Sequence, residues 1–142
     1  MEANKNVREL DEHKINPAND RLRVYAVDEP GPGGANHAYR ILGFNSTSNP
    51  SGLFVGAPGD PCEMATILFQ HGPISEDGVG VNGLTHEALL DILADRLRAF
   101  QKGPYACKEN ACALTHLEEA MHWLQQRTLK RMRRGVEGTH TV

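Results

Sequence analysis

Apolar and polar side chains alternate along residues 21–27, where Leu22, Val24 and Ala26 lie on one face. A period of two residues is typical of a strand that is buried on one side only. The following segment, residues 28–35, contains five glycine or proline residues, which interrupt regular hydrogen bonding between strands. The pattern therefore predicts a first strand that leads into a long hairpin loop.

Further β-prone runs continue this pattern through the first half of the chain. Residues 37–42 predict the second arm of the hairpin, residues 64–70 predict another strand, and residues 53–55 fit a short edge strand. Consecutive strands joined without a long crossover pair antiparallel. We therefore expect a small antiparallel sheet in the N-terminal half.

From Thr85 onward the apolar period changes to 3.6 residues, which is typical of amphipathic helices. The first apolar stripe, capped by Thr85, ends at Phe100 shortly before Gly103, and a second stripe runs from Asn110 and stops at Gly135. At 1.5 Å per residue, helices of about 16 and about 29 residues are about 24 Å and about 43 Å long. We expect a helical hairpin in which nearly half of the second helix overhangs the first.

The overhang carries apolar side chains such as Leu124 and Met132, which the sheet or another subunit must cover. The glycine-rich residues 135–139 also need external contacts to offset their ordering entropy, and we expect a neighbouring subunit to supply them. The sequence thus predicts an oligomeric α+β protein with a small antiparallel β-sheet in its N-terminal half and a long α-helical hairpin after it. The predicted parts are an N-terminal arm (1–20), a β-rich part (21–79), and the helical hairpin with a C-terminal tail (80–142).

Composition agrees with a folded protein of one domain's length, since the 142 residues are 39% apolar and carry a formal net charge of −3. No apolar run is long enough for a transmembrane helix, and the first residues lack the apolar core of a signal peptide. Three cysteines are too few for a disulfide framework. We therefore expect a cytosolic protein without a membrane partner.

A metal site is the first candidate chemistry, because Cys107, Cys112, His116 and His122 carry zinc-ligating groups. Only Cys112 and His116 share a helical face, and two converging ligands fall short of the four that structural zinc needs. We expect no metal, and the sequence indicates no cofactor.

Catalysis is the second candidate, because His71 with Glu76 and Asp77 could supply a general acid and base. These residues lie in a glycine-rich linker without an ordered nucleophile, so we expect no catalytic residues and no enzymatic activity. Residues 30–36 resemble a phosphate-binding glycine loop but have no following helix and no Gly-Lys-Ser/Thr motif. A plain hairpin loop is the better interpretation of that segment.

The end of the second helix is strongly basic, whereas the rest of the chain has a formal charge of −8. The five cations are Arg127, Lys130, Arg131, Arg133 and Arg134. They fit either a solvated helix end that complements the helix dipole or a pocket for a compact phosphate-bearing ligand. A small nucleic-acid-binding module is the alternative function, although the near-neutral pI of about 6.1 argues against nucleic acid as a partner.

Several motifs resemble a known protein family. GVNGLTHEALL, DRLRAFQ, CKENA and RRGVEGT, which begin at residues 80, 95, 107 and 133, resemble the helical-hairpin domain of the phage Thoeris anti-defence and anti-CBASS signal sponges. DEPG, GANHAYR and FQHGPI, which begin at residues 28, 34 and 69, resemble the β-rich N-terminal part of the Thoeris anti-defence branch.

The resemblance implies a non-enzymatic phage protein that captures nucleotide immune messengers in the cytoplasm of the infected bacterial host. The implied small-molecule partners are glycocyclic ADP-ribose, made by TIR-domain enzymes, and, at separate pockets, cyclic di- or trinucleotides made by cGAS-like enzymes. The resemblance also implies a homo-oligomer, a hexamer built as a trimer of dimers.

The family's ADP-ribose pocket uses an aromatic residue, an asparagine and two arginines. The matching positions in this sequence are Phe100, Asn110, Arg127 and Arg40. An aromatic face can stack on adenine, an amide can pair with a base edge, and arginines pair with pyrophosphate. Because Arg127 lies about 25 Å beyond Asn110 along a continuous helix, we expect two chains to share the pocket.

Overall fold

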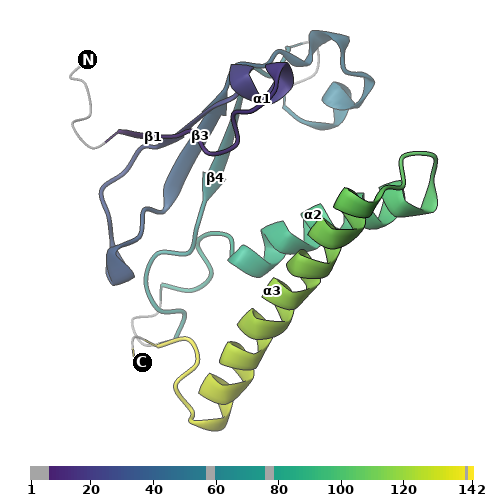
Figure 1. Cartoon of the computed structure of the whole chain (residues 1–142). Helices are drawn as coiled ribbons and strands as arrows, with labels where there is room; N and C mark the ends of the chain where they lie inside the picture. Colours follow the sequence, from purple (N-terminus) through teal and green to yellow (C-terminus); the bar gives the residue numbers. More distant parts are fainter. Residues whose placement is uncertain (1–6, 57–59, 76–78, 140) are drawn as a thin grey trace. The chain divides into compact units, whose positions relative to one another are not determined.

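The structure is a computed structural model that describes residues 7–56, 60–75, 79–139 and 141–142 (Figure 1). Its internal contacts divide the chain into two compact units, Met1–His71 and Gly72–Val142. The first unit carries the strands of an antiparallel sheet, and the second carries two long helices. The predicted α+β class is therefore confirmed.

The sheet is a four-stranded antiparallel meander whose strands follow chain order. The strands are β1 (Arg8–Leu10), β2 (Arg23–Ala26), β3 (Ala38–Leu42) and β4 (Met64–Leu68). β2 and β3 form the predicted hairpin, in which Val24 pairs with Ile41 and Ala26 pairs with Tyr39. Tyr39 in turn pairs with Ile67 of β4. The register therefore collects apolar side chains on one face of the sheet, as the alternation along the sequence predicts.

Residues 53–55 do not form the expected edge strand. Pro50–Phe54 form a 3₁₀ helix, η3, preceded by the short 3₁₀ turn η2 (Ser46–Ser48). Asn49 caps η3 by accepting the backbone N–H of Ser51 at 2.9 Å. An asparagine cap followed by proline favours a helical start, and this local signal outweighs the β propensity of the residues that follow.

Part of the N-terminal arm joins the sheet. β1 pairs antiparallel with β2, and the short helix α1 (Pro17–Arg21) lies between them in sequence. Asn16 caps α1 by accepting the backbone N–H of Asn19 at 2.8 Å. Arg8 donates from Nη2 to Oδ1 of Asn36 at 2.8 Å, which ties β1 to the loop between β2 and β3.

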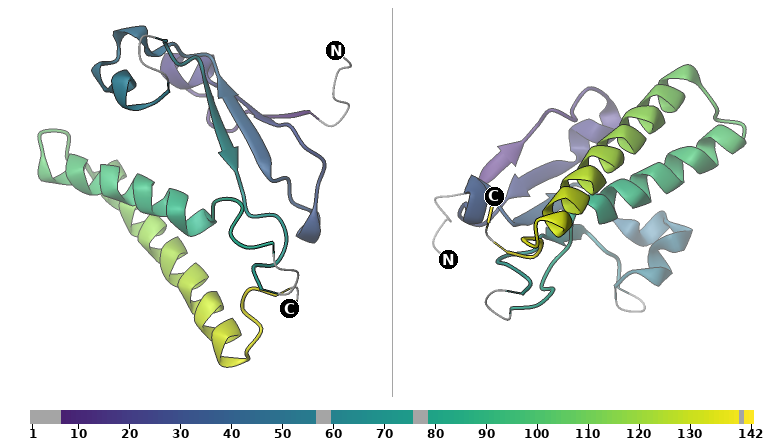
Figure 2. Two further views of the ribbon diagram at one scale, coloured as in Figure 1. Left: turned by 180° about the vertical axis from the view of Figure 1, so that it is seen from behind. Right: turned by 90° about the horizontal axis from the view of Figure 1, so that it is seen from below.

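The second unit contains the helical hairpin, formed by α2 (His86–Lys102) and α3 (Lys108–Arg133) (Figure 2). Thr85 caps α2 as predicted, since its Oγ1 accepts the backbone N–H of Ala88 at 3.2 Å. α3 begins on Cys107, whose Sγ takes the same role for the N–H of Asn110 at 3.4 Å.

α3 is the longer helix, with 26 residues against 17 in α2. At 1.5 Å per residue it is about 39 Å long, so it continues well past the start of α2. Met132, near its end, is 60% exposed, and Leu129 is 42% exposed. The expected overhang is present and carries solvent-exposed apolar side chains. No helix in the described parts of the chain has the length and apolar character needed to cross a membrane.

The chain reverses directly after α3 at Gly135, whose φ is +71°. Gly135 and Val136 each donate a backbone N–H to a carbonyl in the last turn of α3 at 3.0 Å, which is a Schellman arrangement. The carbonyl of Gly138 then accepts both the N–H and the hydroxyl of Ser75 at 3.2 Å. The tail therefore finds ordering contacts within its own chain, whereas the sequence led us to expect them from a neighbouring subunit.

Candidate ligand-binding site

The turn between α2 and α3 brings two of the predicted ligand-binding residues together. Phe100 lies in the last turn of α2 and is 37% exposed, and its ring meets Tyr105 edge to face at 6.2 Å between centroids. Asn110 lies in the first turn of α3, where its Nδ2 makes a long 3.5 Å contact with the carbonyl of Tyr105. We call Phe100, Tyr105 and Asn110 the aromatic turn.

Neighbouring side chains hold the aromatic turn in place. The side-chain amide of Gln101 makes two hydrogen bonds with the backbone of Cys107. Its Oε1 accepts the N–H of Cys107 at 3.1 Å, and its Nε2 donates to the carbonyl of Cys107 at 3.2 Å. The guanidinium carbon of Arg96 lies 5.5 Å from the centroid of the Phe100 ring, a cation–π contact. Tyr105 remains 71% exposed. The turn thus presents aromatic surface to solvent from a fixed backbone.

The third predicted residue, Arg127, lies on a second feature at the other end of α3. This open pocket of about 570 Å³ is formed by the last turns of α3 and the tail, and we call it the basic pocket. Its lining residues are Trp123, Gln126, Arg127, Lys130, Arg131, Arg134, Thr139, Thr141 and Val142. Trp123 is 68% exposed one helical turn before Arg127, so the pocket combines an aromatic face with cations.

Arg131 differs from the other cations of the basic pocket. It is only 8% exposed, and its Nε donates to Oε2 of Glu137 at 3.0 Å. Arg127, Lys130 and Arg134 are exposed. A solvated helix end, one of the two interpretations of the basic cluster, is therefore wrong for Arg131, because the returning tail covers it. The exposed cations supply the positive charge that a phosphate would meet.

The aromatic turn and the basic pocket cannot meet within one hairpin. α3 runs without interruption from Asn110 to Arg127, which follows it by 17 residues. This corresponds to about 25 Å along the helix axis. One chain therefore offers two separated candidate half-sites.

The fourth predicted residue, Arg40, lies in the first unit, on β3. It is exposed and pairs in register with Tyr25 of β2 and Thr66 of β4. Alternation along the strand places it on the face opposite the apolar residues Tyr39 and Ile41.

Sequence reasoning did not single out Tyr105 or Trp123. Both are aromatic residues that remain largely exposed, which is uncommon enough to indicate a binding role when they lie beside polar groups. Their signals were an aromatic residue in the short connection between Phe100 and Asn110, and a tryptophan four positions before Arg127.

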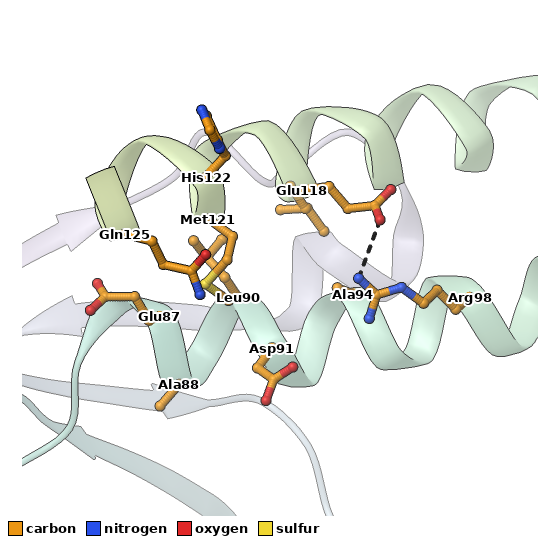
Figure 3. Close-up of a pocket in the computed structure, with 11 residues that line it drawn as sticks. Glu87, Ala88, Leu90, Asp91, Ala94, Arg98, Glu118, Met121, His122 and Gln125 are labelled. Atoms are coloured by element: carbon orange, nitrogen blue, oxygen red, sulfur yellow. Dashed lines mark hydrogen bonds and ion pairs between the residues drawn. The ribbon is translucent and has the colours of Figure 1, made fainter. Parts of the chain in front are cut away.

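A groove of about 500 Å³ lies between α2 and α3, but its charge does not suit a phosphate ligand (Figure 3). Three carboxylates, Glu87, Asp91 and Glu118, line it together with one cation, Arg98. Arg98 is already engaged by Glu118 at 3.3 Å across the groove. An anion would therefore meet net negative charge there, which leaves the aromatic turn and the basic pocket as the candidate half-sites.

The candidate catalytic and metal-ligating residues belong to both units. The ring of His71 packs against that of His37 at 4.4 Å between centroids, while Glu76 and Asp77 lie outside the described residues. Among the residues that the structure describes, no three His, Cys, Asp or Glu side chains converge as metal ligands, and the three cysteines are free thiols.

The Asp28 carboxylate organises the loop between β2 and β3. Burial alone would raise the pKa of Asp28, but the backbone N–H groups of Ala38 and His37 donate to its carboxylate and lower that pKa overall. Asn36 donates to the carbonyl of Asp28 at 2.7 Å and closes the loop. The glycine-rich segment is therefore an ordered hairpin loop.

The aromatic turn lies inside a region that comparison with known proteins singles out, whereas only Trp123, Gln126 and Arg127 of the basic pocket lie within it. Residues 64–129 match the model of the Acb2/Tad1 hairpin domain. The chain is also 49% identical over 78 residues to a protein named Thoeris anti-defense 1 from Bacillus phage SBSphiJ7. That match covers 55% of this chain and 54% of the relative, so it spans about half the length of each. The resemblance noted in the motifs is thus confirmed for residues 64–129, which are similar to the Acb2/Tad1 hairpin domain.

Proposed function

We propose that this protein binds a nucleotide immune messenger and withholds it from the host's defence effector without cleaving it. The observation that carries the proposal is the aromatic turn, an exposed aromatic pair beside an asparagine inside the matched hairpin domain. The proposed messenger is glycocyclic ADP-ribose, and cyclic di- or trinucleotides are proposed for separate pockets. The proposed place of action is the cytoplasm of the infected bacterial host.

The half-sites supply complementary parts of a nucleotide site. The aromatic turn offers Phe100 and Tyr105 for stacking on adenine and Asn110 for its hydrogen-bonding edge. The basic pocket offers Arg127, whose planar guanidinium can bind two phosphate oxygens at once. Arg40 is proposed as a further pyrophosphate contact.

Assembly is part of the proposal, because half-sites about 25 Å apart on one helix need a second chain to meet around one ligand. An antiparallel pair of hairpins places the aromatic turn of one chain beside the basic pocket of the other and creates two equivalent sites. The exposed side chains of Trp123, Leu129 and Met132 supply apolar surface for such contacts. We propose a hexamer, arranged as a trimer of dimers. A monomeric mass at micromolar concentration would contradict this arrangement.

Stoichiometric capture makes specific demands. No turnover multiplies the effect of each protein molecule, so the protein must be abundant relative to the messenger. Its dissociation constant must also lie well below the messenger concentration that activates the effector.

The test is capture followed by release. The purified protein is incubated with glycocyclic ADP-ribose, separated from free ligand, and denatured by heat, and the released nucleotide is analysed by mass spectrometry. Recovery of intact ligand in a fixed ratio to protein supports a sponge. Recovery of cleaved ligand supports a phosphodiesterase, and no uptake together with salt-sensitive DNA binding supports the nucleic-acid module.

A further inference from the structure

Arg131 makes several hydrogen bonds to the described residues of the tail. Its Nη2 donates to the carbonyls of Val136 at 2.9 Å and Thr139 at 3.0 Å, and its Nη1 donates to the carbonyl of Thr141. Its Nε is engaged by Glu137. Four N–H donors of the planar Arg131 guanidinium group thus point at the tail, and the ion pair with Glu137 neutralises the buried charge of Arg131.

The backbone of Arg131 adds a contact in the opposite direction. Its own carbonyl accepts the N–H of Val136 at 3.0 Å, while its guanidinium donates to the carbonyl of that same residue. Val136 is therefore held from both of its backbone polar groups by one arginine, directly after the reversal at Gly135.

Beyond the reversal at Gly135, other hydrogen bonds of the described tail residues come from Ser75 or lie within the tail itself. Gly138 bonds Ser75, and the hydroxyl of Thr139 donates to the carbonyl of Val136 at 2.6 Å, which is a bond within the tail itself. A segment with glycine at positions 135 and 138 loses much conformational freedom on ordering. The hydrogen bonds of the Arg131 guanidinium group are therefore a main contribution that keeps the tail ordered.

The position of the tail determines the shape of the basic pocket. Thr139, Thr141 and Val142 line the pocket together with the cationic face of α3. With the tail released, Arg127 and its neighbours would lie on an open helix surface, where phosphate contacts are more fully hydrated and weaker.

We infer that Arg131 is a positioning residue for nucleotide binding: it holds the tail as the wall of the basic pocket, so that the exposed cations meet a phosphate in a preformed concavity. Arg131 itself does not contact the ligand. This inference rests on the proposed function. The cations at the end of α3 thus have two roles. Arg131 holds the tail, and the exposed Arg127, Lys130 and Arg134 bind the ligand.

The test compares three variants in the full-length chain. Arg131→Gln removes the positive charge and most of the N–H donors of the guanidinium group. Arg131→Lys keeps the charge but loses the planar arrangement of donors. Arg133→Gln is the matched control, because it removes the same charge from an exposed position that does not line the pocket. Amide hydrogen exchange in the tail and the dissociation constant for glycocyclic ADP-ribose are measured for each.

We expect both Arg131 variants to lose exchange protection at Thr139 and Thr141 and to bind at least tenfold more weakly, while Arg133→Gln behaves as the unmodified chain. Gly135→Val supplies a second route to tail release, because a β-branched residue disfavours the φ of +71° at the reversal. Adding Arg131→Gln to Gly135→Val should weaken binding no further. Additive losses would show that Arg131 touches the ligand and would overturn the inference.

Two other outcomes are informative in different ways. Wild-type affinity in an Arg131 variant whose tail has lost protection would overturn the inference and leave the proposed function standing. Absence of binding by the unmodified chain would overturn the proposed function, and the inference with it.

Discussion

The strongest prediction concerns the sharing of one binding site between two chains. Phe100→Ala removes the stacking face of the aromatic turn, and Arg127→Ala removes a phosphate contact of the basic pocket. Stacking of one base is worth about 1–3 kcal/mol, so the first change should weaken binding by about 5- to 140-fold. A hydrogen bond to a charged group is worth about 1.5–3 kcal/mol, which gives about 10- to 140-fold for the second.

The assay is complementation between the two variants. They are unfolded and refolded together in equal amounts, and the capacity for high-affinity binding is measured by calorimetric titration. A site is intact only when its aromatic turn and its basic pocket both come from unmodified halves. With random mixing, about a quarter of the wild-type number of high-affinity sites should therefore reappear, although each parent alone has only weakened sites.

A matched control uses two defects in the same half-site. Phe100→Ala mixed with Asn110→Ala should restore no high-affinity sites, because every aromatic turn in the mixture carries one defect. Failure of the Phe100→Ala and Arg127→Ala mixture to regain binding, with mixed assemblies verified by native mass spectrometry, would refute the sharing of the site. A second chain would then not be needed to bridge the distance of about 25 Å between Asn110 and Arg127.

Three further predictions concern the folded chain and are checked by urea unfolding. Asp28→Asn should destabilise the first unit by about 1–2 kcal/mol at pH 7, allowing for a side chain that is 32% exposed. Because the pKa of Asp28 in the folded protein lies below its ordinary value of 3.8, this stability difference should be full above pH 3.8 and vanish as the pH falls through the lower folded value. Gly43→Ala should lower the free energy of unfolding by about 3 kcal/mol or more, since its new Cβ would lie 1.7 Å from the carbonyl oxygen of Arg21. Gly34→Ala, which has a similar positive φ but open space around the new Cβ, should lower it by about 1–2 kcal/mol. Thr85→Ala should lower the free energy of unfolding by about 1 kcal/mol, because α2 loses its N-cap. Thr115→Ala loses only the hydrogen bond from its hydroxyl to the carbonyl of Ala111 and should leave stability almost unchanged. Equal effects of the two substitutions would contradict the capping role of Thr85.

The sequence predicted those elements whose signals are local. The alternation around Val24 and the 3.6-residue period from Thr85 located the main strands and both helices, because burial of one face determines each pattern. β1 was missed, since Arg8 and Glu9 carry no apolar signal and the strand is held by pairing with β2 and by the bond from Arg8 to Asn36.

The sequence likewise predicted only part of the candidate site. The proximity of Phe100 and Asn110 follows from their places on either side of one short turn, and the structure brings them together. The burial of Arg131 could not be read from the sequence, where it looks like each of its basic neighbours. It depends on the tail reversing at Gly135 and returning its carbonyls to the side chain, which is a tertiary arrangement without a periodic pattern.

The unbroken course of α3 also constrains how this protein can vary. Each inserted or deleted residue between Asn110 and Trp123 would turn the basic pocket by about 100° and shift it by about 1.5 Å relative to the aromatic turn. Both half-sites would stay intact, yet their mutual orientation would change, and no flexible joint in the helix could absorb the error. Substitutions on the exposed side of α3 should therefore be tolerated far more readily in evolution than changes in its length, and any change in length would need a matching change in how the chains pair.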